Sequence, residues 1–270
     1  MALIFITTPI GNEKDITLAA LDGLKESDTF YCEDTRKSKE LFKRLNIDYS
    51  EKRFFAFHDH SKDELIQKIC TQSVDQNIVY VSDAGSPLIS DPAYPLLKFA
   101  IENDYEYRVI SGITAPNYAL EVSGLPAIPS IFHGFVGRSK SDIEKLIQSI
   151  QMINATHIIF EGVARVEKTL SQLCESLPSL DFVIARELTK TYESIHRFKG
   201  SEFAAIKSEI TFKGEFVLLV HNPNSISSNT GLTKLAQEVL ESKAKGKSLA
   251  KLLAACLELK VKDVYNQLNN

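Results

Sequence analysis

The sequence contains no tryptophan and only four cysteines among its 270 residues, and it has no apolar run near the roughly 18 residues that a membrane span needs. The cysteines form no C-x-x-C pair, and their gaps fit neither a zinc site nor a small disulfide framework. They are Cys32, Cys70, Cys174 and Cys256. We therefore expect reduced, mostly buried thiols in a cytoplasmic protein without a membrane segment. The first residues carry no basic stretch and do not look like a signal peptide.

The sequence also has no excess of positive charge. Its 31 basic and 35 acidic residues give a net charge of −4, which argues against a protein that binds nucleic acid through its overall charge. Local basic stretches occur at 36–44, 138–140 and 243–251, so any contact with RNA has to use such patches. A hydrophobic content of 44% with 24% charged residues is typical of a folded globular protein and excludes a disordered chain.

Several common enzyme motifs are missing. The chain has neither the dinucleotide fingerprint G-x-G-x-x-G nor the phosphate-binding G-x-x-x-x-G-K-[ST], and it has neither G-x-S-x-G nor H-E-x-x-H. His58 and His60 form an H-x-H pair that would suit the start of a metal site, but no third ligand stands nearby in the sequence. We therefore expect no metal.

What the first half does contain is an alternation of short apolar runs with helical patterns. Strands are predicted at 3–7, 29–32, 53–57, 78–81 and 108–110, and helices around 18–24, 41–45, 65–69 and 96–101. Such alternation is typical of an α/β domain in which helices cover a mostly parallel sheet. Gly124, Pro126 and Pro129 then interrupt the pattern and predict a domain boundary, so the first domain is expected to span 1–123.

The second half restarts with a different arrangement. Helices are predicted at 142–150, 166–177 and 202–209, and strands at 157–160, 182–186, 194–198 and 216–220. The short gap between the strands at 182–186 and 194–198 predicts an antiparallel pair, hence a mixed sheet over 124–221. Residues 222–231 are rich in Asn and Ser and predict a linker. Residues 232–270 are rich in lysine and helical in pattern, which suits either a helix-turn-helix or a plain helical cap.

Four loops follow strands of the first half, at 7–12, 33–36, 82–92 and 111–115. Each combines small residues with hydroxyls or carboxylates, which allow close approach of a polar ligand. Any one of them is readily explained as an ordinary turn that caps a helix. Because ligands of open α/β sheets bind at the carboxyl ends of the strands, the four loops together predict one shared cleft.

Six short motifs, which occur in a fixed order, make this chain resemble a known family. They are T-P-I-G-N-x-x-D-I-T-L-A-A-L (8–21), E-D-T-R (33–36), V-S-D-A-G-S-P-L-I-S-D-P (81–92), S-G-L-P (123–126), A-R-E-L-T-K-T-Y-E-S-I-H (185–196) and K-G-E-F-V-L-L-V (213–220). With them the chain resembles the tetrapyrrole-methylase superfamily of S-adenosylmethionine (SAM) enzymes, and most closely its branch that methylates ribosomal RNA.

The resemblance implies two α/β domains with SAM in the cleft between them, a homodimer, and a C-terminal extension of helix-turn-helix type. It implies methyl transfer to the ribose 2′-hydroxyl of a decoding-centre cytidine in 16S rRNA of the small ribosomal subunit. The SAM pocket of the family falls on Pro9, Ile10, Asp83, Ala84, Gly85, Ser86, Ile89, Thr114, Ala115, Glu161, Leu188 and Gly214.

The sequence departs from the family in two loops. Where relatives carry Pro-Gly-Pro-Ser-Ala, this chain has Ser-Gly-Ile-Thr-Ala at 111–115. Where relatives carry Glu-Ser-Pro-His-Arg, it has Glu-Gly-Val-Ala-Arg at 161–165, so a histidine is missing. A substrate contact made by that histidine would be changed or weakened here.

Methyl transfer from a sulfonium needs an in-line approach of the nucleophile, and a ribose hydroxyl needs a general base or a nearby cation. Charged residues that follow strands supply candidates. We predict that Arg36 and Lys190 hold phosphate or ribose oxygens, and that Asp34 or Glu187 orients or deprotonates the hydroxyl. Salt bridges between the domains are an equally simple explanation for these side chains, and for Glu33 and Arg186.

Two other functions remain open. One is a small-molecule methylase that acts on a tetrapyrrole, against which the lysine-rich tail and E-D-T-R argue. The other is a non-catalytic RNA-binding or ribosome-assembly protein of the same fold, which the two altered loops favour.

Overall fold

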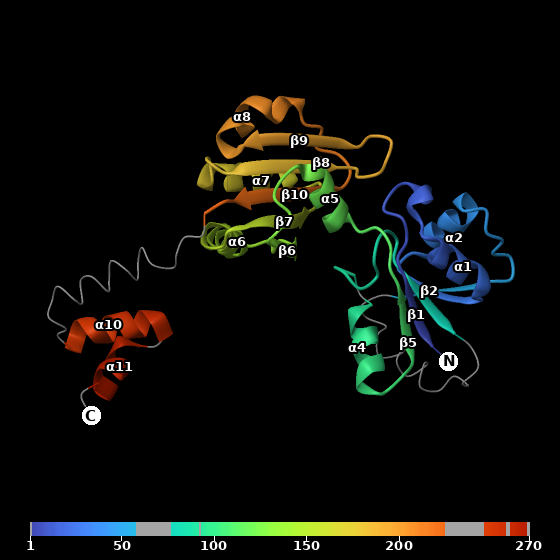
Figure 1. The fold of residues 1–270 in the computed structure, drawn as a ribbon, viewed down its shortest axis with the longest axis horizontal. Helices are drawn as coiled ribbons and strands as arrows, with labels where there is room; N and C mark the ends of the chain where they lie inside the picture. Colours follow the sequence, from blue (N-terminus) through green and yellow to red (C-terminus); the bar gives the residue numbers. More distant parts are fainter. Residues whose placement is uncertain (1, 58–76, 92, 225–245, 258–259, 269–270) are drawn as a thin grey trace.

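The computed structural model describes residues 2–57, 77–91, 93–224, 246–257 and 260–268. These residues form two five-stranded sheets, with helix α5 (Ala115–Ser123) between them along the chain, and a separate pair of C-terminal helices (Figure 1). Within the described part of the chain, no helix is long and apolar enough to cross a membrane.

The first sheet is parallel throughout and has the strand order β3-β2-β4-β1-β5. Its strands are β1 (Leu3–Ile6), β2 (Thr29–Cys32), β3 (Arg53–Ala56), β4 (Ile78–Val81) and β5 (Tyr107–Ile110). Alternate residues of the buried strands enter two cores. Ile4 and Ile6 face α1 (Leu18–Glu26) and α2 (Thr35–Arg44), whereas Leu3 and Phe5 face α4 (Tyr94–Glu102). Coverage of both faces explains why β1, β2 and β4 are buried at every position and almost entirely apolar.

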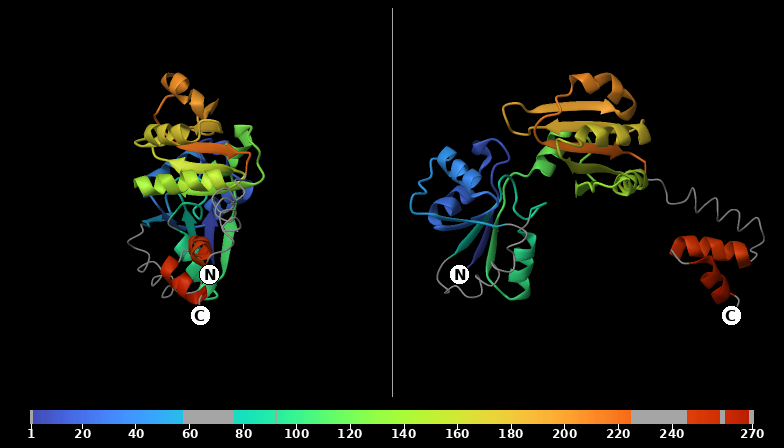
Figure 2. Two further views of the ribbon diagram at one scale, coloured as in Figure 1. Left: turned by 90° about the vertical axis from the view of Figure 1, so that its left-hand side faces the viewer. Right: turned by 180° about the vertical axis from the view of Figure 1, so that it is seen from behind.

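The second sheet is mixed, with the order β6-β7-β10-β8-β9, and only the β6–β7 pair is parallel. Its strands are β6 (Ser130–Phe135), β7 (Ala155–Glu161), β8 (Asp181–Arg186), β9 (Ser194–Lys199) and β10 (Phe216–Asn222). One face packs against α6 (Lys140–Met152), α7 (Val166–Ser176) and α8 (Phe203–Ile206). Helix α5 packs on the opposite face (Figure 1), and the view from behind in Figure 2 shows α7 in yellow in front of the sheet.

Three short 3₁₀ helices complete the described elements: η1 (Glu13–Asp15), η3 (Gly200–Glu202) and η4 (Lys207–Glu209). The C-terminal helices are α10 (Gly246–Leu257) and α11 (Val261–Leu268). They pack on each other through a small apolar cluster of Ala250, Ala254 and Val264. This pairing agrees with either C-terminal prediction, and the helix-turn-helix assignment stays a prediction.

The α/β fold, the parallel first sheet and the mixed second sheet are confirmed. Strand β6 and helix α5 were not predicted, and the helix expected over 202–209 is interrupted: η3, α8 and η4 occupy that stretch. Strand β10 continues to Asn222, one residue into the predicted linker. The helix predicted around 65–69 and residues 225–231 of the predicted linker lie outside the described residues.

The domain division at 123/124 stays a proposal. Helix α5 lies before that division in the sequence but packs against strands of the second sheet. Of the cysteines, Cys32 and Cys174 are buried free thiols, as expected.

Candidate active site

The loops that follow β1 and β4 are joined by backbone hydrogen bonds. Thr8 N donates to Gly85 O at 2.9 Å, and Gly85 N donates to Thr8 O at 3.0 Å. The Ser82 hydroxyl also donates to Gly85 O, at 2.8 Å. Gly85 has a φ of +81°, which L side chains rarely adopt, so this tight junction depends on glycine. These hydrogen bonds thus hold the loops after β1 and β4 together at the carboxyl edge of the first sheet.

A cavity of about 530 Å³ lies between this edge and the second sheet. The first half contributes the loops after β1, β2, β4 and β5. The second half contributes β6, β10 and the loops after β7, β8 and before β10. Its lining residues are Ile10, Glu33, Lys37, Asp83, Ala84, Gly85, Ser86, Ile89, Ser90, Asp91, Thr114, Ala115, Pro116, Phe135, Phe160, Glu161, Gly162, Val163, Leu188, Gly214, Glu215, Phe216 and Val217. All the residues proposed for SAM line it except Pro9, which is buried beside Ile10.

Glu161 belongs to the floor of the cavity and is fully buried. Its carboxylate accepts hydrogen bonds from Gly162 N at 2.8 Å and from the Thr169 hydroxyl at 2.7 Å, and it pairs with Arg165 at 2.6 Å. Arg165 in turn donates to Val136 O at 3.0 Å. Because the Glu161 oxygens are already engaged, this residue fixes the loop over 161–165 and holds its backbone at the cavity.

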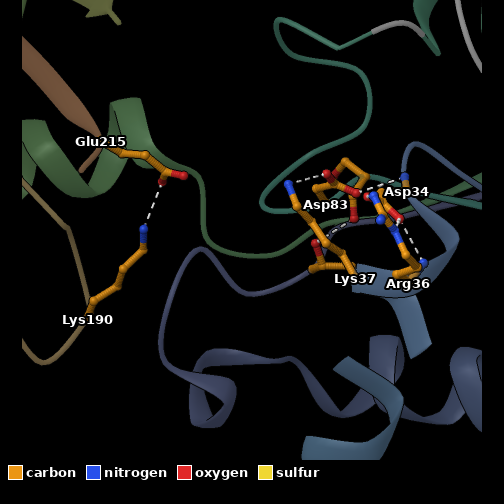
Figure 3. A network of polar contacts seen from close by, with 8 residues as sticks. Asp34, Arg36, Lys37, Asp83, Lys190 and Glu215 are labelled. Carbon is orange, nitrogen blue, oxygen red and sulfur yellow. Dashed lines mark hydrogen bonds and ion pairs between the residues drawn. The ribbon is translucent and has the colours of Figure 1, made fainter. Parts of the chain in front are cut away.

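On the side of the first sheet, Asp83 joins two loops. Its Oδ1 accepts from Asp34 N at 3.1 Å, and its Oδ2 pairs with Lys37 Nζ at 2.7 Å. Asp34 caps helix α2 and holds Arg36 through two further hydrogen bonds, at 3.1 and 2.8 Å. Figure 3 shows this network and, across from it, Lys190 and Glu215 of the second half.

On that opposite side, Lys190 Nζ lies 3.0 Å from both Glu187 Oε1 and Glu215 Oε2. The loop docks on the first half, since Asn12 N donates to the Thr189 hydroxyl at 3.0 Å and a Cβ at Gly11 would clash with Lys190. This contact joins the loop after β1 to the loop after β8, next to Ile10 and Leu188, which line the cavity.

Residues 2–204 match the family of Tetrapyrrole (Corrin/Porphyrin) Methylases. A relative from Streptococcus pyogenes serotype M18, a ribosomal RNA small subunit methyltransferase I, is 30% identical over 274 residues, which cover 99% of this chain and 94% of the relative. The chain belongs to the tetrapyrrole methylase family. A relative of the same name from Halalkalibacterium halodurans is 36% identical over 219 residues, or 81% of this chain and 75% of the relative.

Two solved structures of low sequence identity share the fold of this chain. Diphthine synthase superimposes with a TM-score of 0.64 at 17% identity, over 82% of this chain and 90% of its own. Uroporphyrin-III C-methyl transferase from Thermus thermophilus, complexed with S-adenyl homocysteine, gives a TM-score of 0.54 at 14% identity, over 83% and 98%. These comparisons confirm the family and the fold that the sequence motifs predicted.

In this tetrapyrrole methylase the four residues predicted to be catalytic lie beside the cavity, and none of them lines it: Asp34, Arg36, Glu187 and Lys190. Hydrogen bonds from Arg36 hold the pKa of Asp34 well below its usual range. The pKa of Glu187 is also lowered: burial opposes the ionised form, but the Glu215 amide and Lys190 outweigh it. Neither carboxylate is basic enough for an effective proton acceptor near neutral pH.

Among the described residues, the ion pairs of these four side chains each lie within one half. The Asp34–Arg36 pair lies within the first half, and Lys190 pairs with two residues of the second. The structure instead adds Lys37 and Asp91 to the cavity wall. Asp91 stands in the quoted motif V-S-D-A-G-S-P-L-I-S-D-P, so a signal for it was present in the sequence.

The wall of the tetrapyrrole methylase cavity is acidic. Its described lining contains Glu33, Asp83, Asp91, Glu161 and Glu215, and its cations are limited there to Lys37. Such a wall favours a cationic ligand. No group of three potential metal ligands occurs among the described residues, and His58 and His60 fall outside them.

Proposed function

We propose that this chain transfers a methyl group from SAM to the ribose 2′-hydroxyl of a decoding-centre cytidine in 16S rRNA, within the small ribosomal subunit. The observation that carries the proposal is the cavity between the two sheets, because it gathers nearly all the residues that the resemblance assigned to SAM. The names of relatives that match 81–99% of the chain supply the class of substrate. The ribose oxygen and the cytidine follow from the sequence resemblance.

The residues present fit SAM in size, shape and charge. A volume of about 530 Å³ lies within the range of small-molecule sites. Gly85 and Gly214, with φ values of +81° and +94°, let backbone approach the ligand closely. Ile10, Leu188 and Val217 offer apolar walls for a nucleoside, and the carboxylates complement a positive charge. When bound, SAM supplies an electrophilic methyl group on a sulfonium ion.

The protein contributes chiefly by positioning. Thr114 and Ala115, at the start of α5, and the loop over 83–86 meet at the cavity and provide hydrogen-bonding backbone for the donor. Arg36 and Lys37 at the start of α2 are exposed, with side-chain accessibilities of 87% and 61%, and are placed to contact phosphates of a substrate RNA. Lys190 keeps the same predicted role on the other side. We also propose that the enzyme acts in the cytoplasm as a homodimer.

The deciding experiment is transfer of labelled methyl from SAM to small ribosomal subunits of a host that lacks this gene, followed by nucleoside analysis. The expected product is labelled 2′-O-methylcytidine. Label at another nucleotide of the rRNA would reject the decoding-centre cytidine as the methylated position. Label on a precorrin but not on rRNA would support a small-molecule methylase that acts on a tetrapyrrole. SAM binding without any transfer would support a non-catalytic RNA-binding or assembly protein.

A further inference from the structure

The carboxylate of Asp91 differs from the other carboxylates in the cavity wall. Asp83 pairs with Lys37, Glu161 with Arg165, and Glu215 with Lys190. Glu33 also interacts with a neighbour. Within the part of the chain that the structure describes, no hydrogen bond or ion pair engages Asp91. Its oxygens are therefore available to a group that enters the cavity.

Asp91 is partly buried and lies among groups that oppose a negative charge. Burial raises the pKa of Asp91 to about 7, and the carboxylates of Glu33 and Asp83 act in the same direction. The Tyr80 hydroxyl is buried, and it has no hydrogen-bond partner in the part of the chain that the structure describes. Burial raises the Tyr80 pKa, and Glu33 and Asp91 raise it further, so this hydroxyl stays protonated beside the cluster.

We propose that Asp91 is the catalytic base that accepts the proton of the ribose 2′-hydroxyl, a role that rests on the function proposed above. As the ribose oxygen forms its bond to the methyl carbon, the carbon–sulfur bond breaks and its electron pair stays on sulfur. The hydroxyl proton passes to the Asp91 carboxylate. The products are a methyl ether, a neutral thioether and a protonated Asp91, so atoms and charge balance without a further reactant.

The neighbours of Asp91 set how basic it is. Glu33 and Asp83, which follow strands β2 and β4, line the same cavity and raise the pKa of Asp91, and Asp91 in turn raises the pKa of Tyr80. Lys37 of α2 approaches but is held by Asp83, and Glu161 and Glu215 line the opposite wall. Glu33 and Asp83 thus act as positioning residues, because their charge keeps Asp91 a proton acceptor near neutral pH. A base is most effective when its pKa lies near the working pH.

The test uses the full-length protein, labelled SAM and small ribosomal subunits, with kcat measured from pH 5.5 to 9. For the native chain we expect kcat to rise with pH and level off above about 7, because Asp91 must lose its proton to act. Asp91→Asn is expected to lower kcat by roughly 100-fold or more and to abolish this rise, while Kd for SAM changes by less than about threefold. Asp91→Glu should restore part of the activity and the rise with pH.

Glu33→Gln gives a readout that does not depend on Asp91→Asn folding correctly. It removes a negative charge near Asp91, so the midpoint of the kcat profile should move to lower pH by roughly half a unit to one unit. Asp104→Asn, at an exposed turn before β5, is the matched control and should leave the profile unchanged.

The two proposals fail in different ways. If the native chain transfers no methyl to the subunits, the proposed function is rejected. If the native chain is active but Asp91→Asn keeps its kcat within about threefold and the same pH profile, only the role of Asp91 is rejected. If the midpoint of the kcat–pH profile does not move in Glu33→Gln, the role of Asp91 as the base is likewise rejected.

Discussion

At the scale of single residues, Glu161 anchors the cavity floor through contacts that leave little of its carboxylate for a ligand. Three donors from the same loop and helix, Gly162 N, Arg165 and the Thr169 hydroxyl, converge on it. The sequence resemblance assigned Glu161 to the SAM pocket. In the structure Glu161 lines the cavity, where its carboxylate supports the backbone of the loop over 161–165. Loss of the Glu161 carboxylate should therefore lower the free energy of unfolding.

Replacing Glu161 by Gln should lower the free energy of unfolding by roughly 2–4 kcal/mol, because Arg165 loses its counter-ion in a largely buried setting. The matched control is Glu167→Gln in α7, whose partner Lys207 forms an ion pair with both side chains exposed. That change should cost less than about 1 kcal/mol. Urea unfolding of the two variants measures the difference. Equal losses would show that the buried contacts of Glu161 are not what holds this loop.

At the scale of elements, helix α5 is held at its C-terminus by a side chain from the second sheet. Arg197 of β9 donates from Nε to Ser123 O at 2.7 Å and from its guanidinium to Val122 O, so it satisfies two carbonyls that a helix end leaves open. The N-terminal end of the same helix brings Thr114 and Ala115 to the cavity. The position of this helix therefore couples β9 to the candidate SAM site.

Arg197→Ala should raise Kd for SAM by roughly 3- to 10-fold with a smaller effect on kcat, because it loosens a helix whose first residues line the cavity proposed for SAM. Calorimetric titration with SAM and single-turnover methyl transfer separate the two quantities. Arg138→Ala, in the exposed turn before α6, removes the same charge and should leave Kd unchanged. A tenfold loss of kcat with Kd intact would contradict this account.

Strands β6 and β7 share a pair of hydrogen-bonded histidines. His133 Nε2 lies 2.8 Å from His157 Nδ1, and His157 Nε2 lies 3.2 Å from Ile153 O. His157 must donate to that carbonyl, so its Nδ1 accepts and His133 donates from Nε2. Burial and the neighbouring ring lower the pKa of His133 to about 4, and burial also lowers the pKa of His157. Both rings are neutral in the folded protein near neutral pH.

Acid should therefore destabilise this sheet. Below pH 6.5 the unfolded chain binds a proton that folded His133 does not bind until about pH 4, so stability is lost as pH falls through that window. We expect His133→Gln to remove roughly 2 kcal/mol of the loss between pH 7 and pH 4.5, measured by urea unfolding at both values. An unchanged pH dependence in the variant would show that other groups dominate the acid response.

At the scale of the whole molecule, the elements predicted best from the sequence are strands that are buried along their whole length. The runs Thr29–Cys32 and Ile78–Val81 are buried at every position because helices cover both faces of the first sheet, and their predicted bounds match the structure. Strand β6 was missed because it is an edge strand with partly exposed residues and a bulge after Phe132. Its Phe135 nevertheless lines the cavity.

The residues of the candidate site were likewise predicted where a local motif marks them and missed where tertiary packing brings them to the cavity. Loop residues such as Asp83 and Gly85 stand in motifs and were predicted, whereas Lys37 and Phe135 reach the cavity through the packing of α2 and of strand β6. The proposed acid–base residues Asp34 and Glu187 have charges of the expected kind, but only coordinates reveal that cations already engage them. Pairing of charges depends on side-chain distances, which no spacing in the sequence specifies.

The C-terminal helices supply the last prediction. Four exposed lysines lie in α10, in α11 or directly before α11, on a chain that is acidic overall: Lys247, Lys251, Lys260 and Lys262. If these lysines bind phosphates, changing all four to Ala should weaken binding to small ribosomal subunits by roughly tenfold or more. The dependence of log K on log salt should also flatten, by about 0.7 for each phosphate that the variant no longer neutralises. Filter binding at 50–300 mM KCl, on the order of physiological salt, measures both effects. Kd for SAM should not change.

The matched control replaces four exposed lysines in the helices that pack on the two sheets, Lys25, Lys98, Lys145 and Lys168. Equal salt slopes for the two variants would mean that the tail does not bind RNA through its charge, and would leave the start of α2 as the remaining basic surface beside the cavity.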